Sequence, residues 1–350
     1  MESIDAEIEF SKKLITALFD IESMKKIKTV IRRNNFNKLK PLLTSIDNKI
    51  WRNCLIYSIH YNLEKIFKKI INNSNVNIDI MANNFEILKY CIYYRNMRMI
   101  NKLLCYDVAT YINFNDAYAL VRACKVNDIE MVKLLVNNGA DVYAQNCISI
   151  ISASVNGCLE IVELLLEKMS LRKLDGLDGL DNLDITNFDI SMISAVRYKY
   201  ECIARRLLEV GANVNINNSE ALIVAAENGD AQMVKLLLAY GADANARDGD
   251  VLKRAIKSEC LEVVSILVNY KNDVGDCVCD LSKGNSRALR WAVFRGNYEI
   301  TKLLLESKNA NGEFRCDVQA EDNDAMRLAK KYDHQNIVEL LEAHNNFVGM

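Results

Sequence analysis

The chain has 350 residues, of which 50% are hydrophobic and 26% charged, and its formal net charge is −2. This is the composition of a soluble folded protein. The chain contains no run of about 18 uncharged apolar residues and its N-terminus has no apolar core run, so we expect neither a transmembrane helix nor a secretory signal. The eleven scattered cysteines are typical of reduced thiols, and we expect a cytoplasmic protein.

The N-terminal segment is predicted to flank a regular array. Apolar residues at helical spacing between residues 3 and 23 indicate an amphipathic helix, so we assign residues 1–24 to a helical cap. Residues 25–49 are assigned to a degenerate repeat, in which Pro41 would remove a hydrogen bond from the second helix.

The same segment carries a basic cluster. Residues 1–100 hold 17 Lys and Arg against 10 Asp and Glu, and no acid lies between Glu22 and Asp47. Two interpretations are open: a solvated helix face, or a surface that contacts nucleic acid or an acidic protein. The cluster consists of Lys25, Lys26, Lys28, Arg32, Arg33, Lys38 and Lys40.

Residues 50–344 repeat one pattern about nine times. Each repeat has an apolar anchor at the start of a V-K-L-L-L-like segment, a small or thiol residue nine positions earlier, and an apolar residue three positions before that. The spacing of three predicts a first helix with a buried stripe, and the anchor segment predicts a second helix. The anchors are Phe67, Ile100, Val132, Val162, Ala204, Val234, Val264, Thr301 and Val338. Helices of about ten residues are unstable alone, so stacking must stabilise them.

Polar residues and glycines mark the helix ends. In eight of the nine repeats, an Asp, Asn or Ser six or seven residues before the small residue is expected to cap the first helix. An Asn-Gly pair such as Asn156-Gly157 is expected to end that helix, and Asp128 and Asp230 to cap the second one. The expected first-helix caps are Asn84, Asp116, Asn146, Asp189, Ser219, Asp248, Ser286 and Asn323.

With these features the chain resembles the ankyrin-repeat family. The resemblance is carried by the Asn-Gly breaks, the E-I-V-x-L-L-L second helices and the turns Gly139-Ala140-Asp141, Gly211-Ala212-Asn213 and Gly241-Ala242-Asp243. It implies an all-α ankyrin-repeat solenoid of stacked helix-turn-helix units. Short or irregular hairpins are expected, because the regular spacing is 30 residues against the usual 33 and the opening Thr-Pro-Leu-His is absent. The short repeats, rich in Asn, Ile and Lys, are similar to those of ankyrin proteins of large DNA viruses, for which the host cytoplasm would be the compartment.

Longer spacings predict insertions. The insertion near residues 167–190 includes Leu171–Ile185, where Leu recurs every third position and four Asp follow. This period matches no EF-hand calcium loop, so we expect a solvated loop. Two seven-residue insertions, near Lys271–Asn285 and Ser307–Asp322, should extend connections on the same face. The Cys277-Val278-Cys279 run lacks the spacing of a zinc site, and residues 345–350 are assigned to a tail.

Motifs for catalysis are not apparent. The three histidines are dispersed, and we find no phosphate-binding loop, nucleophile elbow or metal-binding His pair in the sequence. We therefore expect no enzyme, cofactor, metal ion, small-molecule substrate or membrane contact.

The resemblance also implies where a partner would bind. In ankyrin-like stacks, two residues at the end of each first helix line the concave face. These 18 positions, here called the helix-end surface, are His60, Tyr61, Tyr93, Tyr94, Lys125, Val126, Val155, Asn156, Arg197, Tyr198, Glu227, Asn228, Lys257, Ser258, Phe294, Arg295, Lys331 and Tyr332. Six of the 18 are Phe or Tyr, against 8% aromatic residues in the chain.

Phe, Tyr and Arg are typical anchors of protein interfaces. The alternative interpretation is that the rings fill space against neighbouring helices. We expect a protein–protein interaction scaffold with an unidentified protein partner. Its groove anchors are Tyr61, Tyr93, Tyr94, Arg197, Tyr198, Phe294, Arg295 and Tyr332. The alternative function is binding of nucleic acid or an acidic partner through the basic cluster, against which the acid-rich remainder of the chain argues.

Overall fold

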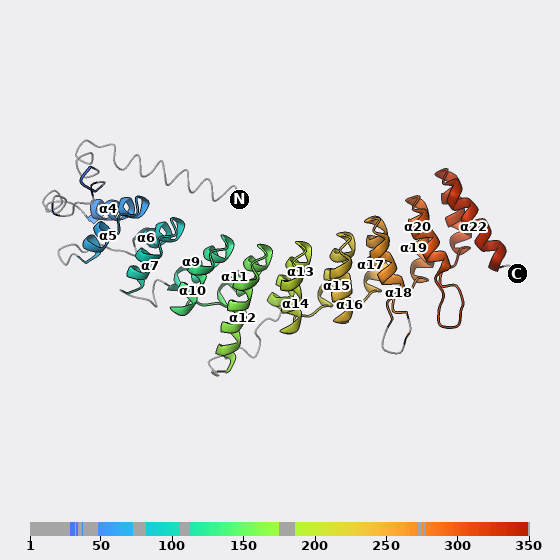
Figure 1. Cartoon of the computed structure of the whole chain (residues 1–350), viewed down its shortest axis with the longest axis horizontal. Helices are drawn as coiled ribbons and strands as arrows, with labels where there is room; N and C mark the ends of the chain where they lie inside the picture. Colours follow the sequence, from blue (N-terminus) through green and yellow to red (C-terminus); the bar gives the residue numbers. More distant parts are fainter. Residues whose placement is uncertain are drawn as a thin grey trace. The chain divides into compact units, whose positions relative to one another are not determined.

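The computed structural model describes residues 29–31, 33, 37, 48–72, 82–105, 112–174, 186–271, 275 and 277–348. Within these residues the regular elements are helices, and the only β pairing is two isolated antiparallel bridges (Figure 1). The cap assigned to residues 1–24 and most of the degenerate repeat assigned to residues 25–49 lie outside the described residues, and both stay predictions.

The described helices form pairs along the chain, a first and a second helix in each repeat. The pairs are α4 (Asn48–His60) and α5 (Glu64–Ile71), α6 (Ala82–Tyr93) and α7 (Met97–Leu104), α9 (Phe114–Lys125) and α10 (Ile129–Asn137), α11 (Ala144–Val155) and α12 (Leu159–Leu174), α13 (Thr186–Arg197) and α14 (Glu201–Glu209), α15 (Ile216–Glu227) and α16 (Ala231–Ala239), α17 (Ala246–Lys257) and α18 (Leu261–Asn269), α19 (Lys283–Phe294) and α20 (Tyr298–Glu306), and α21 (Ala320–Lys331) and α22 (Gln335–Val348).

The chain divides into two compact units, Met1–Ser149 and Ile150–Met350, here called the N-terminal and C-terminal units. In the C-terminal unit the first helices α13, α15, α17, α19 and α21 contact one another in order, and the second helices α12 to α22 do the same in a parallel layer. In the N-terminal unit α4, α6 and α9 form the first-helix layer, and α5 packs on α7. Each unit is thus an all-α stack of helix pairs, as the repeats predict.

The core of each unit is the stripe that the sequence predicts. All nine anchors are buried, from Phe67 to Val338, and so are all nine small or thiol residues, from Ser58 to Ala329. Of the nine apolar residues three positions earlier, only Met326 is half-buried, and the others are buried. Since each short helix buries its stripe against the preceding and following repeats, burial of apolar surface between repeats stabilises the stack.

The prediction of helix caps is confirmed for the second helices at Asp128 and Asp230 and is wrong for the first helices at Asp189, Ser219 and Ser286, while the side chains of Asn84 and Asp116 lie outside the described residues. Asp128 and Asp230 accept hydrogen bonds from the backbone N–H groups of Met131 and Met233, at 3.3 and 3.1 Å. In the first helices, by contrast, the side chains of Asp189, Ser219 and Ser286 accept from backbone N–H groups of the following inter-repeat turn. These donors are Asn213, Asp243 and Asp317, at 2.6, 3.1 and 2.8 Å.

A left-handed backbone is found at five of the expected caps, and Asp189 is not one of them. Asn146, Ser219, Asp248 and Asn323 each belong to three consecutive residues with φ values between 51° and 80°, a left-handed turn at the start of the first helix. Ser286 also has a positive φ, of 56°. A residue in this conformation directs its side chain away from its own helix. At Ser219 and Ser286 the side chain in this left-handed turn binds the following inter-repeat turn instead.

In three of the described connections, an asparagine at the end links the connection to the next one. The side chain of Asn215 donates to the carbonyl of Gly241 at 2.9 Å and accepts from the N–H of Asp243 at 2.8 Å. Asn245 makes the same pair with Val278 and Asp280, at 2.8 and 2.7 Å. In the N-terminal unit Asn113 binds Gly139 and Asp141 at 3.3 and 2.7 Å. These bonds satisfy backbone groups that a β hairpin would otherwise pair.

The insertions have more order than the sequence indicates. Both seven-residue insertions are closed by antiparallel bridges, Lys271 with Cys277 and Lys308 with Phe314. Helix α12 continues to Leu174, so the first four residues of the predicted loop Leu171–Ile185 are helical, and residues 175–185 lie outside the described residues. Helix α22 reaches Val348, so most of the segment 345–350 is helix rather than tail.

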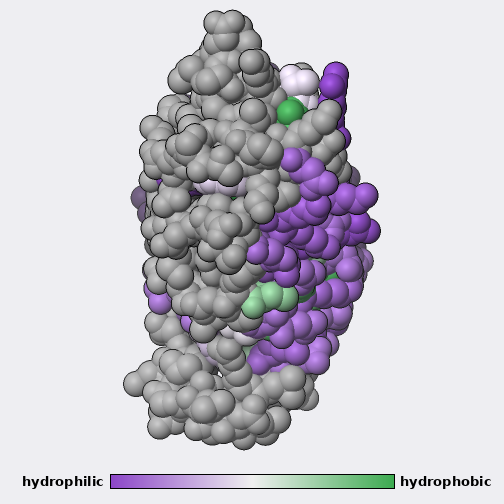
Figure 2. Space-filling view, turned by 90° about the vertical axis from the view of Figure 1, so that its left-hand side faces the viewer, coloured by the Kyte–Doolittle hydropathy of each residue, from purple (hydrophilic) through white to green (hydrophobic). Residues whose placement is uncertain are grey.

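The face seen in Figure 2 is mainly polar where its residues are described. Figure 2 views the molecule from the side of α4 and α5, where the coloured residues are mostly hydrophilic and hydrophobic ones are scattered. No helix in the described residues is both long and apolar enough to cross a bilayer. The same residues contain no group of three or more His, Cys, Asp or Glu arranged to hold a metal ion. Among the described residues, exposed apolar side chains are the features that could mark a binding surface.

Candidate functional site

The helix-end surface is accessible to solvent along both units. None of its 18 side chains is buried. Each lies two or three residues after a buried small residue, so the helical rotation turns it away from the core. Eight large apolar side chains are exposed in the described residues, and five of them belong to this surface. The five are Tyr61, Val126, Tyr198, Phe294 and Tyr332, with exposed fractions of 40, 45, 52, 39 and 42%.

In the N-terminal unit the aromatic residues of this surface pack on one another. The ring of Tyr94 lies edge-on to both His60 and Tyr93, with centroid distances of 4.9 Å in each case. A hydrogen bond of 2.5 Å joins His60 Nδ1 to the Tyr94 hydroxyl. Burial, together with the neighbouring tyrosines, raises the pKa of Tyr94 to about 12, so its hydroxyl stays neutral. These contacts support the space-filling interpretation for Tyr93 and Tyr94, which are half-buried, while Tyr61 remains exposed.

At the start of the C-terminal unit, Arg197 and Tyr198 lie side by side at the end of α13. Arg197 forms an ion pair of 3.4 Å with Glu220 of α15. Tyr198 stacks on Tyr200 with a centroid distance of 6.4 Å. At 52% exposed, Tyr198 is the most accessible large apolar side chain in the described residues. One side of the Tyr198 ring therefore contacts Tyr200, and the other side is exposed to solvent.

Further along the C-terminal unit, three rings form a continuous path across two repeats. Phe294 of α19 packs edge-on against Trp291, at 5.7 Å, and against Tyr332, which follows α21, at 5.1 Å. Arg295 forms a short ion pair with Glu259, and Lys331 lies over the Tyr332 ring at 5.4 Å. The predicted residues Phe294, Arg295 and Tyr332 are thus brought together, and the pairs T-stack in the geometry that aromatic rings prefer.

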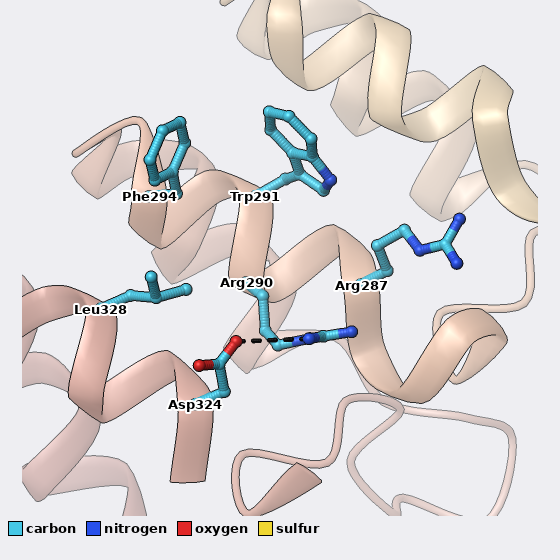
Figure 3. A pocket seen from close by; sticks show the side chains of 6 residues that line it. All are labelled: Arg287, Arg290, Trp291, Phe294, Asp324 and Leu328. Atoms are coloured by element: carbon cyan, nitrogen blue, oxygen red, sulfur yellow. Dashed lines mark hydrogen bonds and ion pairs between the residues drawn. The ribbon is translucent and has the colours of Figure 1, made fainter. Parts of the chain in front are cut away.

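Beside this path lies a hollow of about 340 Å³ (Figure 3). Its lining from α19 is Arg287, Arg290, Trp291 and Phe294, and from α21 Asp324 and Leu328. The four residues of α19 are spaced three, one and three apart, which places them on one face of the helix. Arg290 and Asp324 face each other across the hollow as an ion pair of 3.3 Å.

Five of the six lining residues were not among the predicted anchors. Trp291, Arg290 and Arg287 lie three, four and seven residues before Phe294, on the same helix face. The predicted partner positions are the last residues of each first helix, and these three residues lie one to two turns before them. The signal available was the helical spacing itself, because residues one and two turns before an exposed anchor share its face.

Only one residue of the basic cluster is among the described residues. Arg33 is exposed, and Lys25, Lys26, Lys28, Arg32, Lys38 and Lys40 lie outside the described residues. The cluster therefore stays a prediction.

Comparison with known proteins agrees with the repeat pattern. A family model described as ankyrin repeats (3 copies) matches residues 100–175, 191–276 and 252–348. Ankyrin repeat protein R599 of Acanthamoeba polyphaga mimivirus is 23% identical over 288 residues, which cover 79% of this chain and 72% of that protein. Ankyrin repeat protein R602 of the same virus is 31% identical over 128 residues, which cover 34% of this chain and 40% of that protein.

Proposed function

Because this chain belongs to the ankyrin-repeat family, whose repeats generally act as protein–protein interaction scaffolds, we propose that it is a non-catalytic scaffold that binds a protein partner through its helix-end surface. The proposed anchors are Tyr61, Arg197, Tyr198, Phe294, Arg295 and Tyr332, whereas Tyr93 and Tyr94, predicted together with them, are half-buried against each other and fill space instead. The groove on the first-helix side and the connecting loops receive the partner.

One observation supports this proposal above the others. Five of the eight exposed large apolar side chains in the described residues fall on the helix-end surface. Exposed aromatic side chains carry a hydration cost that a partner can remove, and they lose little conformational entropy when they bind. A chain that needed these rings only as filler would bury them between helices, as it does with Tyr57.

We also propose a reducing compartment, the cytoplasm. None of the eleven cysteines forms a disulfide, and six of them are buried. Free thiols in these numbers persist where the surroundings keep them reduced. Microscopy of the fluorescently tagged chain in infected or transfected cells tests this proposal, and accumulation in the secretory pathway would contradict it.

The binding proposal is tested in two steps. The full tagged chain first captures partners from a lysate, mass spectrometry identifies them, and one purified partner is then titrated against variants. We expect Tyr61→Ala, Tyr198→Ala and Phe294→Ala each to weaken binding by about 1–3 kcal/mol if they are anchors. Tyr240→Ala is the matched control, since Tyr240 is as exposed as Tyr61, at 40%, but follows the second helix α16.

The alternative predicts the opposite pattern. If the basic cluster binds nucleic acid or an acidic protein, Arg32→Ala and Arg33→Ala abolish binding and affinity falls steeply with salt. Unchanged affinity in the three aromatic variants, with native circular dichroism, would rule out the helix-end surface.

A further inference from the structure

The hollow between α19 and α21 has the size of a single side-chain pocket. Its volume of about 340 Å³ lies at the small end of ligand pockets. Trp291, Phe294 and Leu328 supply apolar walls, and Figure 3 shows the two rings side by side on one side of the hollow. A ring that enters can pack edge-on against Trp291 or Phe294, the arrangement that these two rings already have with each other.

The lining of this hollow holds two arginines, Arg287 and Arg290, and one carboxylate, Asp324. Asp324 is shared between Arg290 at 3.3 Å and Arg327 at 3.0 Å, so one carboxylate serves two guanidinium groups. On the side of α17, Lys253 lies over the Trp291 ring at 5.3 Å and 3.6 Å from Asp250, which also pairs with Arg254 at 3.3 Å.

Arg287 adds a further positive charge. Its side chain is exposed, it lines the hollow, and it forms no ion pair or hydrogen bond with another described residue. An exposed guanidinium beside an apolar wall is well suited to a carboxylate, which it can bind through two parallel hydrogen bonds.

From this combination we infer that the hollow binds a peptide segment of another protein that carries an aromatic side chain next to acidic residues. The aromatic side chain fills the space between Trp291, Phe294 and Leu328, and the acidic residues pair with Arg287 and Arg290. This inference rests on the proposed function, and it adds the chemistry of the partner.

Nucleic acid is the less suitable occupant. Bases could stack on Trp291, and arginines could contact phosphates. However, a phosphate backbone that follows the first helices would pass the carboxylates of Asp324, Asp250 and Glu227, which lie on this side of α21, α17 and α15 and pair with the local cations. These acids lower the affinity for a continuous polyanion, whereas a peptide presents only a few charges at chosen positions.

The test uses a phage-displayed library of random nine-residue peptides, selected on the full chain and depleted on the Arg287→Glu/Phe294→Ala variant. We expect the enriched peptides to share an aromatic residue with at least two Asp or Glu among its neighbours. A synthetic, fluorescently labelled copy of one enriched peptide then gives dissociation constants by anisotropy. Arg287→Glu should weaken its binding at least tenfold, and replacing its aromatic residue by Ala should do the same.

Two controls locate the binding. Lys330→Glu makes the same charge change on α21, two residues beyond Leu328 and so on the opposite side of that helix, and it should change affinity less than twofold. The chain has only two tryptophans, and Trp51 is buried in the N-terminal unit. A peptide-induced change in tryptophan emission should therefore disappear in Trp291→Phe, although the peptide still binds.

The inference is overturned by failure to enrich any peptide, by enriched peptides that are basic or lack an aromatic residue, or by competition from oligo-dT at lower concentration than the acidic peptide. Its failure is distinct from failure of the proposed function. A captured protein whose binding depends on Tyr61 and Tyr198 but not on Arg287 would leave the scaffold proposal intact and remove only this pocket.

Discussion

At the scale of single residues, neighbouring repeats fit together where the first helix turns into the second. In several repeats, the side chain before the second helix contacts the left-handed residue that ends the first helix of the preceding repeat. Asn96 donates to Asn62 at 2.9 Å, and Asp128 pairs with Arg95 at 2.6 Å. Where that left-handed residue is Gly157, the ring of Tyr200 occupies the space above it. The glycine thus serves two needs, a positive φ and room for the next repeat.

This double role predicts that Gly157→Ala is more destabilising than Gly241→Ala, a substitution at a glycine with a positive φ but no neighbour in that space. Its φ is 73°, and a Cβ atom would lie 2.4 Å from the Tyr200 ring. We expect urea unfolding to show a loss of about 2–3 kcal/mol, from left-handed strain and displacement of the ring. Gly241→Ala is the control, because Gly241 has a φ of 84° and nothing within 4 Å of the added Cβ.

Strain alone should cost the control about 1 kcal/mol. Equal losses in the two variants would show that Tyr200 moves freely and that the contact adds nothing.

At the scale of elements, the two seven-residue insertions are joined by Arg315. Its guanidinium donates to the carbonyl of Val268 at 2.7 Å and to Ser307 Oγ at 3.0 Å, and it also binds the carbonyl of Cys279. Arg315 therefore binds the first insertion, the second insertion and the end of α18 at the same time. The sequence predicts that both insertions lie on one face, and this side chain shows how they are held together.

Replacing this cation should open both insertions at once. We expect Arg315→Met to lower stability by about 1.5–3 kcal/mol, the range for hydrogen bonds to a charged group. Amide hydrogen exchange should increase in residues 277–280 and 307–316 together. Arg205→Met is the matched control, since Arg205 forms only an exposed ion pair with Glu201 at 2.6 Å and such pairs contribute little. Faster exchange in one insertion alone would contradict the shared role.

At the scale of the whole molecule, reduced thiols are part of the core of both units. Burial raises the pKa of Cys54 to about 12, and it raises the pKa of Cys279 and Cys316 to about 12 against a smaller opposing effect of Arg315. The ordinary value is 9.0. The folded state therefore holds these protons more tightly than the unfolded state does.

This difference predicts how stability depends on pH. Below about pH 9 the thiols are protonated in both states and their contribution is constant. As the pH rises from 9 towards 12 the unfolded thiols ionise first, and the free energy of unfolding falls by up to about 1.4 kcal/mol per pH unit for each thiol. Urea unfolding between pH 8 and 10.5 should show a smaller decline in Cys279→Ala/Cys316→Ala than in the unaltered chain. Identical slopes would contradict the prediction.

The candidate site shows where sequence reasoning reaches its limit. The positions of Tyr61, Tyr198, Phe294 and Tyr332 follow from one helical register, because a residue two or three places after a buried one must face away from the core. Whether such a ring stays open depends on the neighbouring repeat. Tyr94 is half-buried because Tyr93 of its own repeat and His60 of the preceding repeat lie against it. The contact with His60 cannot be predicted from the residues of one repeat.

The sequence by itself determined the repeats, the buried stripe of each helix and the caps of the second helices, because these depend on residues a few positions apart on one helix. Only the tertiary structure decided the role of Ser219 and Asp189, the clamp of Arg315 and the composition of the hollow beside Phe294. Each of these joins residues separated by 24 to 47 positions in the chain. Such pairs depend on how one repeat stacks on the next. The residues of a single helix do not specify which side chains come into contact in that stacking.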